Sequence, residues 1–287
     1  MNAGIASDTP APKAQTANEP LAPWLDRWGL TLDGAAFTTR FGSRLAPVLK
    51  AGAPAMLKLA GNQEERRGGA LMAWWDGQGA ARVLAREGDA LLMERLTGPG
   101  DLAAMARGGQ DDEATIVLCQ VAAGLHAPRG KPPPDGLVPL DVWFRALAPA
   151  AAAHGGTFAR SLTAAWTLLA TPREAVVLHG DLHHGNVLDG GERGWLAIDP
   201  KGLIGERGFD YANLFRNPDA ATALAPGRMR RRAAIIAERA RLEPERLLTW
   251  VLAYAGLGAA WSLASGRDGD AAAGLAMAEM AAAELAR

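Results

Sequence analysis

The segment 179–202, HGDLHHGNVLDGGERGWLAIDPKG, is the part of this chain that most restricts its fold. Its short apolar runs, Val187–Leu188 and Trp195–Ile198, are interrupted by glycines and charged residues, where a purely structural hairpin would alternate regularly. The Asp189-Gly190-Gly191 turn predicts that the two runs pair with each other. Ala-rich helical patterns lie on both sides, so the segment predicts a small β element within a helical domain.

Three side chains with hard oxygens are expected to meet at one edge of this hairpin. Asn186 follows Asp181 closely, and the hairpin returns the chain so that Asp199 comes alongside them. Oxygen ligands in small number suit Mg²⁺, which keeps several waters and shares substrate phosphates. One aspartate beside a glycine is often only a turn former, but the three residues together indicate a metal and phosphate site.

The histidines His179, His183 and His184 leave a zinc site open as an alternative. Their spacing lacks the helical His-Glu-x-x-His arrangement with its glutamate base, and the neighbouring glycines disfavour a helix. We therefore expect His179 to brace the loop through hydrogen bonds, while His183 or His184 lines the site.

The predicted secondary structure changes along the chain: short strands with one helix come first, and mostly helices follow. A chain of 287 residues exceeds what one hydrophobic core comfortably holds, which favours two domains. We expect a flexible tail at 1–22, a small strand-rich lobe at 23–97 and a larger, mostly helical lobe at 98–287, in an α+β fold.

Periodicity and turn residues predict the individual elements. The expected strands are Phe37–Leu49, Ala55–Leu59, Ala81–Leu84, Ala90–Leu96 and Val176–His179; the expected helices are Glu64–Trp75, Asp112–His126, Leu140–His154 and Phe158–Leu169, one from Phe209 and one from Asn217-Pro218, with Arg228–Arg232 as a solvated helix face.

Composition excludes several classes of protein. The formal net charge of −1 argues against a nucleic-acid-binding protein, because such proteins carry clustered basic residues. The single cysteine, Cys119, excludes a disulfide framework and favours a reducing compartment, so we expect a cytoplasmic protein. The uncharged stretch Leu247–Gly266 is long enough to span a membrane, but its glycines and small residues favour a buried core helix, and we expect no membrane partner.

Lysine is scarce in this chain, and Lys58 lies at the centre of the apolar strand pattern Ala55–Leu59. An ammonium group there costs burial energy unless it faces solvent or serves a specific anion. Its position therefore indicates either an exposed strand face or a binding role.

The text HGDLHHGNVL followed by AIDPKG resembles the catalytic segment of the aminoglycoside phosphotransferase family, whose fold is protein-kinase-like. LKL around Lys58, LLMERL at 91–96 and DPKGLIGERGFDYANLFRNP at 199–218 are also similar. The last of these points to the aminoglycoside/hydroxyurea resistance kinases, which include streptomycin 6-kinases. The resemblance implies a bilobal fold and ATP-dependent transfer of phosphate to a hydroxyl of a small cationic molecule of the streptomycin type.

The resemblance also implies roles for residues. Asp181 would accept or orient the proton of the acceptor hydroxyl, while Asn186 and Asp199 would hold Mg²⁺ against the β- and γ-phosphates of ATP. Lys58 would bind the α- and β-phosphates. The remaining candidates are Glu64 beside Lys58, Glu94 and Leu96 for the adenine, and His179, His184, Lys201 and Asp210 for substrate contact or support of the loop.

The sequence departs from the kinase pattern in several places. No glycine-rich loop precedes Lys58, so we expect backbone of the Thr39–Arg44 region to replace it. The acid that should pair with Lys58 is open between Glu64 and Glu65, because Gly68 occupies the place where the subgroup often has one. A kinase of another alcohol or amine (a sugar, a choline-like amine or hydroxyurea) and a nucleotide-binding protein without phosphate transfer remain alternatives.

Overall fold

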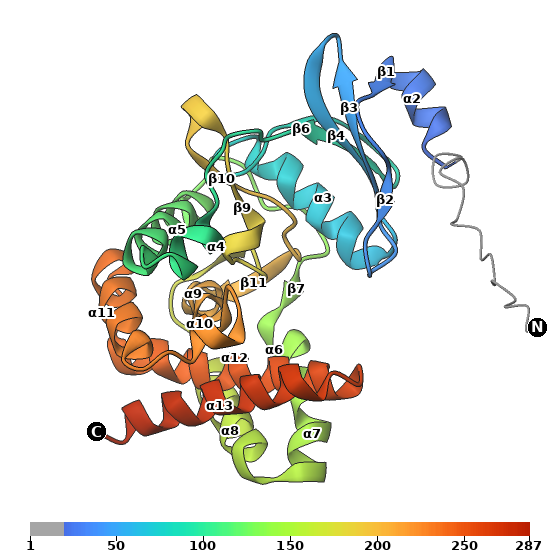
Figure 1. Ribbon diagram of the computed structural model, residues 1–287. Helices are drawn as coiled ribbons and strands as arrows, with labels where there is room; N and C mark the ends of the chain where they lie inside the picture. The colour runs from blue at the N-terminus through green and yellow to red at the C-terminus, as the bar shows by residue number, and fades with distance from the viewer. Residues whose placement is uncertain (1–19) are drawn as a thin grey trace, which may run out of the picture. The chain divides into compact units, whose positions relative to one another are not determined.

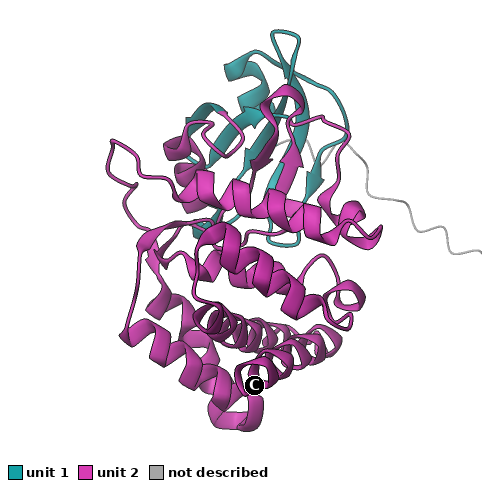
Figure 2. Cartoon of the chain, turned by 90° about the vertical axis from the view of Figure 1, so that its left-hand side faces the viewer, with its two compact units in different colours: residues 1–66, 83–95 teal, residues 67–82, 96–287 magenta. Residues whose placement is uncertain are grey.

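The computed structural model describes residues 20–287 and divides the chain into two compact units. The first unit holds residues up to 66 together with 83–95, and the second holds 67–82 and 96–287 (Figure 2). The expected tail at 1–22 falls, apart from its last three residues, outside the described part. The division differs from a single boundary at 97/98, because residues 67–82 group with the second unit.

The first unit is built on an antiparallel sheet in the order β1-β3-β4-β6-β5, with β2 paired to β3 (Figure 1). The predicted run Phe37–Leu49 is wrong as one strand, because a turn at Gly42, with φ of +85°, breaks it in two. The strands are β1 Leu30–Leu32, β2 Phe37–Thr38, β3 Arg44–Lys50, β4 Ala53–Leu59, β5 Val83–Glu87 and β6 Ala90–Glu94.

One face of this sheet packs on helix α2, Ala22–Trp28. Val48, Leu57 and Leu92 form a buried cluster there with Leu21, and the α2 tryptophans pack against it. Strand side chains alternate between faces, so Lys58, the neighbour of Leu57 on β4, belongs to the opposite face.

Helix α3, Gln63–Trp75, confirms the expected helix and runs from the first unit into the second. In the second unit the Trp75 indole donates a hydrogen bond to the carbonyl of Leu125 at 3.3 Å, and the Trp74 indole donates to Pro132 at 2.6 Å. These contacts explain why the C-terminal part of α3 groups with the helical unit.

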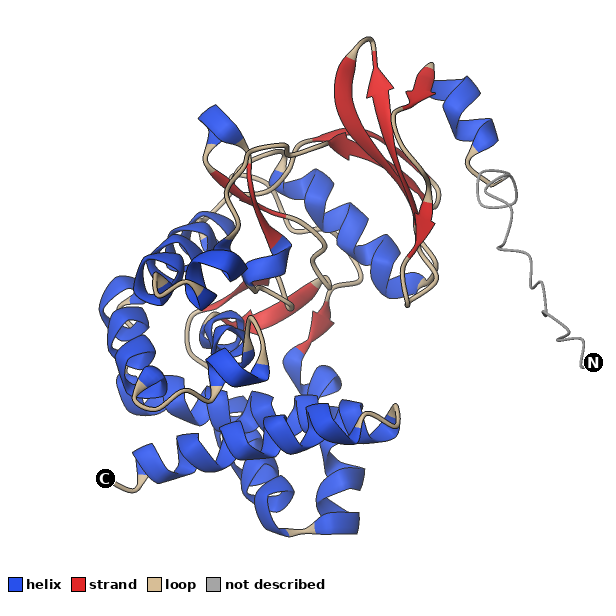
Figure 3. Cartoon of the chain, viewed as in Figure 1, coloured by secondary structure: helices blue, strands red, loops and turns tan. Residues whose placement is uncertain are grey.

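The second unit is mostly helical and carries two small sheets (Figure 3). One sheet has the order β7-β11-β8, and the other is the β9–β10 hairpin. Its strands are β7 Val138–Pro139, β8 Ala175–Leu178, β9 Val187–Asp189, β10 Trp195–Ala197 and β11 Leu203–Glu206; its helices are α4 Leu102–Arg107, α5 Asp111–His126, α6 Leu140–Trp143, α7 Leu147–His154, α8 Gly156–Ala170, α9 Gly208–Asn213, α10 Ala220–Ala223, α11 Arg228–Ala240, α12 Pro244–Ala264 and α13 Asp268–Leu285, with short 3₁₀ turns at 144–146, 184–186, 191–193 and 214–216.

Helix α12 contains the uncharged stretch and is a core helix. It has the length and hydropathy of a membrane span, but 72% of its most apolar window is buried within the protein. Trp250, Ala253 and Leu257 are all buried, and α12 packs against α8 and α13. This confirms the expectation of a buried helix.

Three expectations for the helical unit were wrong. The helix predicted at Leu140–His154 is divided by the 3₁₀ turn at 144–146. Helix α10 begins after Asn217-Pro218, because the Asp219 side chain caps it by accepting a bond from the Thr222 backbone at 2.9 Å. Arg228 and Arg232, one helical turn apart, are 3% and 1% exposed, so only Arg230 and Arg231 of this run form the expected solvated face.

Candidate active site

The hairpin β9–β10 brings the two ends of the 179–202 segment together. Val187 pairs with Ala197, and the Ile198 backbone N–H donates to the Asn186 carbonyl at 2.9 Å. Asn186 is therefore opposite Ile198, and Asp199 is the next residue along the chain. The register thus brings the backbone of Asn186 next to that of Ile198–Asp199, as the expected hairpin requires.

Asp181 is held at both its backbone and its carboxylate. Its carbonyl accepts a hydrogen bond from Asn186 Nδ2 at 2.9 Å, and its Oδ1 accepts one from Asn213 Nδ2 at 3.0 Å. The side chain is 33% exposed, so the carboxylate remains accessible to an acceptor molecule. A half-exposed carboxylate with a fixed orientation can orient a hydroxyl and take its proton.

Asp210 lies under the loop that carries Asp181. This fully buried carboxylate accepts hydrogen bonds from the backbone N–H groups of His179 and Gly180, each at 2.8 Å, and from His126 Nε2 at 2.8 Å. Burial opposes its charge, but the bonds from His126 and Gly180 outweigh burial and hold the pKa of Asp210 below its usual value. The side chain from α9 therefore fixes the backbone that precedes Asp181.

His179 braces the same loop from inside the unit. Its Nε2 donates to the Ile198 carbonyl at 2.8 Å, while its Nδ1 accepts the Asp181 backbone N–H at 3.2 Å. Burial lowers the pKa of His179 and keeps the ring neutral. With both ring nitrogens hydrogen-bonded, His179 has no lone pair for zinc, and no cluster of three or more potential ligands occurs within residues 20–287.

The other two histidines of the loop lie in different surroundings. His184 is buried against Arg232, with 3.4 Å between Nε2 and Nη2, and burial lowers its pKa to about 3. His183 is partly exposed, and its Nε2 lies 3.8 Å from Asp181 Oδ2. Of these two residues, His183 borders the open carboxylate and His184 packs inside.

Asn186, Asp199 and Lys201 form the remaining polar set of the hairpin. Because Asn186 Nδ2 is bonded to Asp181, its Oδ1 is left as a cation ligand. Asp199 adopts a left-handed φ of +59°, unusual for a residue with a side chain and typical of functional sites, and its Oδ2 lies 3.5 Å from Lys201 Nζ. An amide oxygen and a carboxylate fit Mg²⁺ that also binds phosphates and water.

In the first unit, Lys58 on β4 forms a buried ion pair with Glu65 of α3. Glu64, the acid that we grouped with Lys58 from the sequence, is less buried than Glu65, so the structure favours Glu65 as the partner. Gly68 accommodates no acid, since a Cβ there would lie 2.2 Å from the Pro200 carbonyl oxygen in the second unit.

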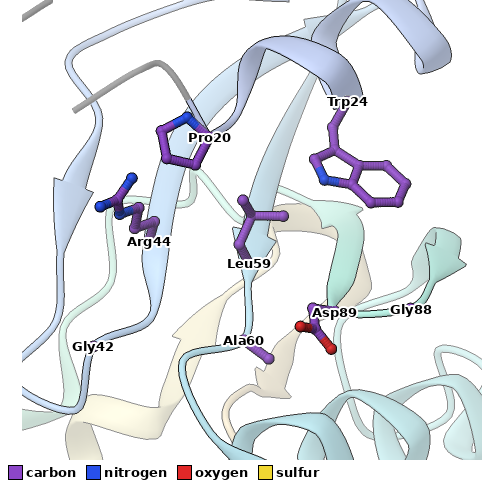
Figure 4. A pocket seen from close by; sticks show the side chains of 8 residues that line it. All are labelled: Pro20, Trp24, Gly42, Arg44, Leu59, Ala60, Gly88 and Asp89. Atoms are coloured by element: carbon purple, nitrogen blue, oxygen red, sulfur yellow. The ribbon is translucent and has the colours of Figure 1, made fainter. Parts of the chain in front are cut away.

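A cavity of about 650 Å³ lies in the first unit (Figure 4). It is bordered by Trp24 of α2 and by Leu59, which shares the face of Leu57 on β4. The cavity is therefore separate from the lysine.

The two residues predicted to bind the adenine fall in different units. Glu94 ends β6 in the first unit and Leu96 begins the second, so these two candidates lie on either side of the division.

Several polar residues near Asp181 were missed by sequence analysis. Asn213 bonds the carboxylate, Asn217 bonds Asn213, and the buried arginines of α11 bond the backbone between them. The i, i+4 spacing of the two asparagines and of the two arginines was the available signal.

A small antiparallel sheet whose Lys58 pairs with Glu65 of α3, followed along the chain by a mostly helical unit, is the architecture of the protein-kinase-like phosphotransferases. The chain matches the aminoglycoside/hydroxyurea antibiotic resistance kinases over residues 27–266, and it belongs to this family of kinases.

Individual relatives agree with this assignment. The chain is 53% identical over 247 residues to a streptomycin 3''-kinase of Klebsiella pneumoniae, covering 84% of this chain and 92% of that protein. It is 33% identical over 275 residues to a streptomycin 6-kinase of Streptomyces griseus, covering 90% and 87%. A crystal structure of a thermostable mutant of aminoglycoside phosphotransferase APH(4)-Ia with ADP and hygromycin B matches the fold with a TM-score of 0.61 at 14% identity, covering 91% of this chain and 96% of that one.

Proposed function

We propose that this protein is an ATP-dependent kinase that transfers the γ-phosphate to a hydroxyl group of streptomycin. The observation that carries this proposal is the accessible Asp181 carboxylate, whose Oδ1 accepts a hydrogen bond from Asn213 and whose backbone carbonyl accepts one from Asn186. Because identity to the 3''-kinase is 53% and to the 6-kinase 33%, we propose the 3''-hydroxyl as the acceptor.

In the proposed reaction, the acceptor oxygen bonds to the γ-phosphorus while the bond from that phosphorus to the departing ADP breaks. Asp181 orients the acceptor hydroxyl and receives its proton. Phosphoryl transfer requires mainly positioning and charge neutralisation, which suits an aspartate held in one orientation by its neighbours.

The other candidate residues would bind ATP and its Mg²⁺. Asn186 and Asp199 would hold Mg²⁺, which neutralises charge on the β- and γ-phosphates when bound. Lys58, held by Glu65, would contact the α- and β-phosphates, and the backbone at Glu94–Leu96 would bind the adenine. Lys201, close to Asp199, is placed for a phosphate or substrate contact. We place the protein in the cytoplasm, with a small cationic substrate and no nucleic-acid or membrane partner.

The proposal is tested by incubating the protein with Mg-ATP and separate acceptors: streptomycin, hygromycin B, hydroxyurea, choline and a simple sugar. We expect phosphorylated streptomycin, with fragment masses that locate the phosphate on the 3'' position. Phosphate on the 6 position would correct the acceptor site alone. Phosphorylation of another acceptor but not of streptomycin would overturn the substrate assignment.

The same assay separates catalysis from nucleotide binding alone. The Asp181→Asn protein should still bind ATP, but it should phosphorylate streptomycin far more slowly than the wild-type protein does. A wild-type protein that binds ATP and phosphorylates none of the acceptors would favour the non-catalytic alternative.

A further inference from the structure

The segment Ala212–Pro218 follows the first turn of α9 and contributes Asn213 to the surroundings of Asp181. Its Asn213 is 4% exposed, and its Nδ2 donates to Asp181 Oδ1 at 3.0 Å. A buried amide that bonds a carboxylate at the candidate active site restricts how that carboxylate can rotate.

The orientation of the Asn213 amide is itself determined by a second asparagine. Asn217 Nδ2 donates to the Asn213 carbonyl at 3.0 Å and to Asn213 Oδ1 at 3.3 Å. Since Oδ1 of Asn213 accepts from Asn217, its Nδ2 is the atom that faces Asp181.

Two buried arginines of α11 hold this segment in place. Arg228 Nη2 donates to the Asn217 carbonyl at 2.7 Å, and Arg232 donates to the Leu214 carbonyl. Both arginines pair with the Asp111 carboxylate at the start of α5. Because the Asp111 carboxylate holds both guanidinium groups, the position of Asn213 depends on the packing of α5, α9 and α11.

The two oxygens of Asp181 are therefore unequal. Oδ1 has a hydrogen bond from Asn213, whereas the closest donors to Oδ2 are Asn186 Nδ2 at 3.4 Å and His183 Nε2 at 3.8 Å. Distances of this length correspond to weak hydrogen bonds at most. Oδ2 is thus the oxygen with capacity for a further strong bond.

We propose that Asn213 is a positioning residue that holds Asp181 Oδ1 and so presents Oδ2 to the acceptor hydroxyl. This inference rests on the proposed phosphoryl transfer. The hydroxyl proton moves to Oδ2 as the acceptor oxygen bonds to the γ-phosphorus and ADP departs, and Asn213 neither gains nor loses a proton.

The test compares Asn213→Ala with wild type in the phosphorylation of streptomycin. We expect kcat to fall about 10- to 100-fold, because a displaced catalytic group loses its alignment, while KM for streptomycin and for ATP stays within about threefold. Asp101→Ala, which removes the N-terminal cap of α4, is the control: it lowers the melting temperature and leaves kcat unchanged.

A double-mutant cycle distinguishes positioning from general support of the structure. In the Asp181→Asn background, Asn213→Ala should have no further effect on the residual rate, because the group that it orients is no longer a base. If the two losses multiply, Asn213 acts independently of Asp181 and the inference is overturned. It is also overturned if Asn213→Ala raises KM at unchanged kcat.

If Asn213→Ala does not fold, Asn217→Ala provides a second test. It should also lower kcat, by a smaller factor than is expected for Asn213→Ala. If the wild-type protein does not phosphorylate streptomycin, the proposed function fails, and if Asp181→Asn keeps wild-type turnover, the role of Asp181 as the base fails together with the positioning role of Asn213. If Asp181→Asn loses turnover while the Asn213 and Asn217 variants keep theirs, only the positioning role fails.

Discussion

The candidate base and the candidate phosphate-binding lysine are held in contrasting ways. Asp181 accepts a hydrogen bond from Asn213, and the buried Asp210 holds the loop before it by accepting the backbone N–H groups of His179 and Gly180. Lys58 lies on a strand of the first unit and is paired with Glu65. A general base works in one orientation, whereas an ammonium group attracts phosphate from many directions, so the two roles need different amounts of support.

The largest expected effect tests the role of the aspartate itself. Asp181→Asn should lower kcat by about 10²- to 10⁴-fold, because the amide is a far weaker base than the carboxylate. The fold should persist, since an amide oxygen can still accept from Asn213. Steady-state kinetics with streptomycin measures the loss, and circular dichroism checks the fold.

Removing the support of the loop should affect stability as well as activity. Asp210→Ala leaves two backbone N–H groups and His126 without their buried acceptor, and we expect the free energy of unfolding to fall by about 3–5 kcal/mol. Urea denaturation measures this change. A loss below about 1 kcal/mol would show that the loop does not depend on Asp210.

Substitutions at the Lys58–Glu65 pair should have a smaller effect, and this effect should be on ATP affinity. Glu65→Gln removes the partner charge of Lys58 and should weaken ATP binding about tenfold, equivalent to about 1.4 kcal/mol. Glu64→Gln is the matched variant one residue away, and titration calorimetry should find a smaller change. An equal or larger effect of Glu64→Gln would reverse the assignment of the pair.

The smallest effect concerns pH. Burial lowers the pKa of His179 in the folded protein, so this residue stabilises the fold above its unfolded pKa of about 6.5 and progressively less as the pH falls below it. One titrating group can contribute at most about 1.4 kcal/mol per pH unit to this slope. In urea titrations at pH 7 to 5, His179→Gln should flatten the slope, and an unchanged slope in that variant would contradict the lowered pKa of His179.

Sequence reasoning was most successful where the relevant contacts are local. The β9–β10 hairpin between Asn186 and Asp199 formed as expected, because its turn residues and apolar runs are visible in the sequence. The buried nature of α12 likewise followed from its small residues.

It was least successful where helix packing decides the outcome. Glu64 and Glu65 point about 100° apart on a helix, so the docking of α3 decides which one meets Lys58. Arg228 and Arg232 resemble surface residues in the sequence, and only the placement of Asp111 by α5 makes their burial possible.

The central claim is that the aspartate governs the chemical step while the lysine pair governs nucleotide affinity. The most direct test measures the ATP dissociation constant and the single-turnover rate with saturating ATP and streptomycin for both Asp181→Asn and Glu65→Gln. We predict that Asp181→Asn keeps the wild-type dissociation constant and loses about 10²- to 10⁴-fold in rate, whereas Glu65→Gln loses affinity and keeps most of the rate. Wild-type turnover in Asp181→Asn, or a loss of ATP affinity there equal to that of Glu65→Gln, would contradict the claim.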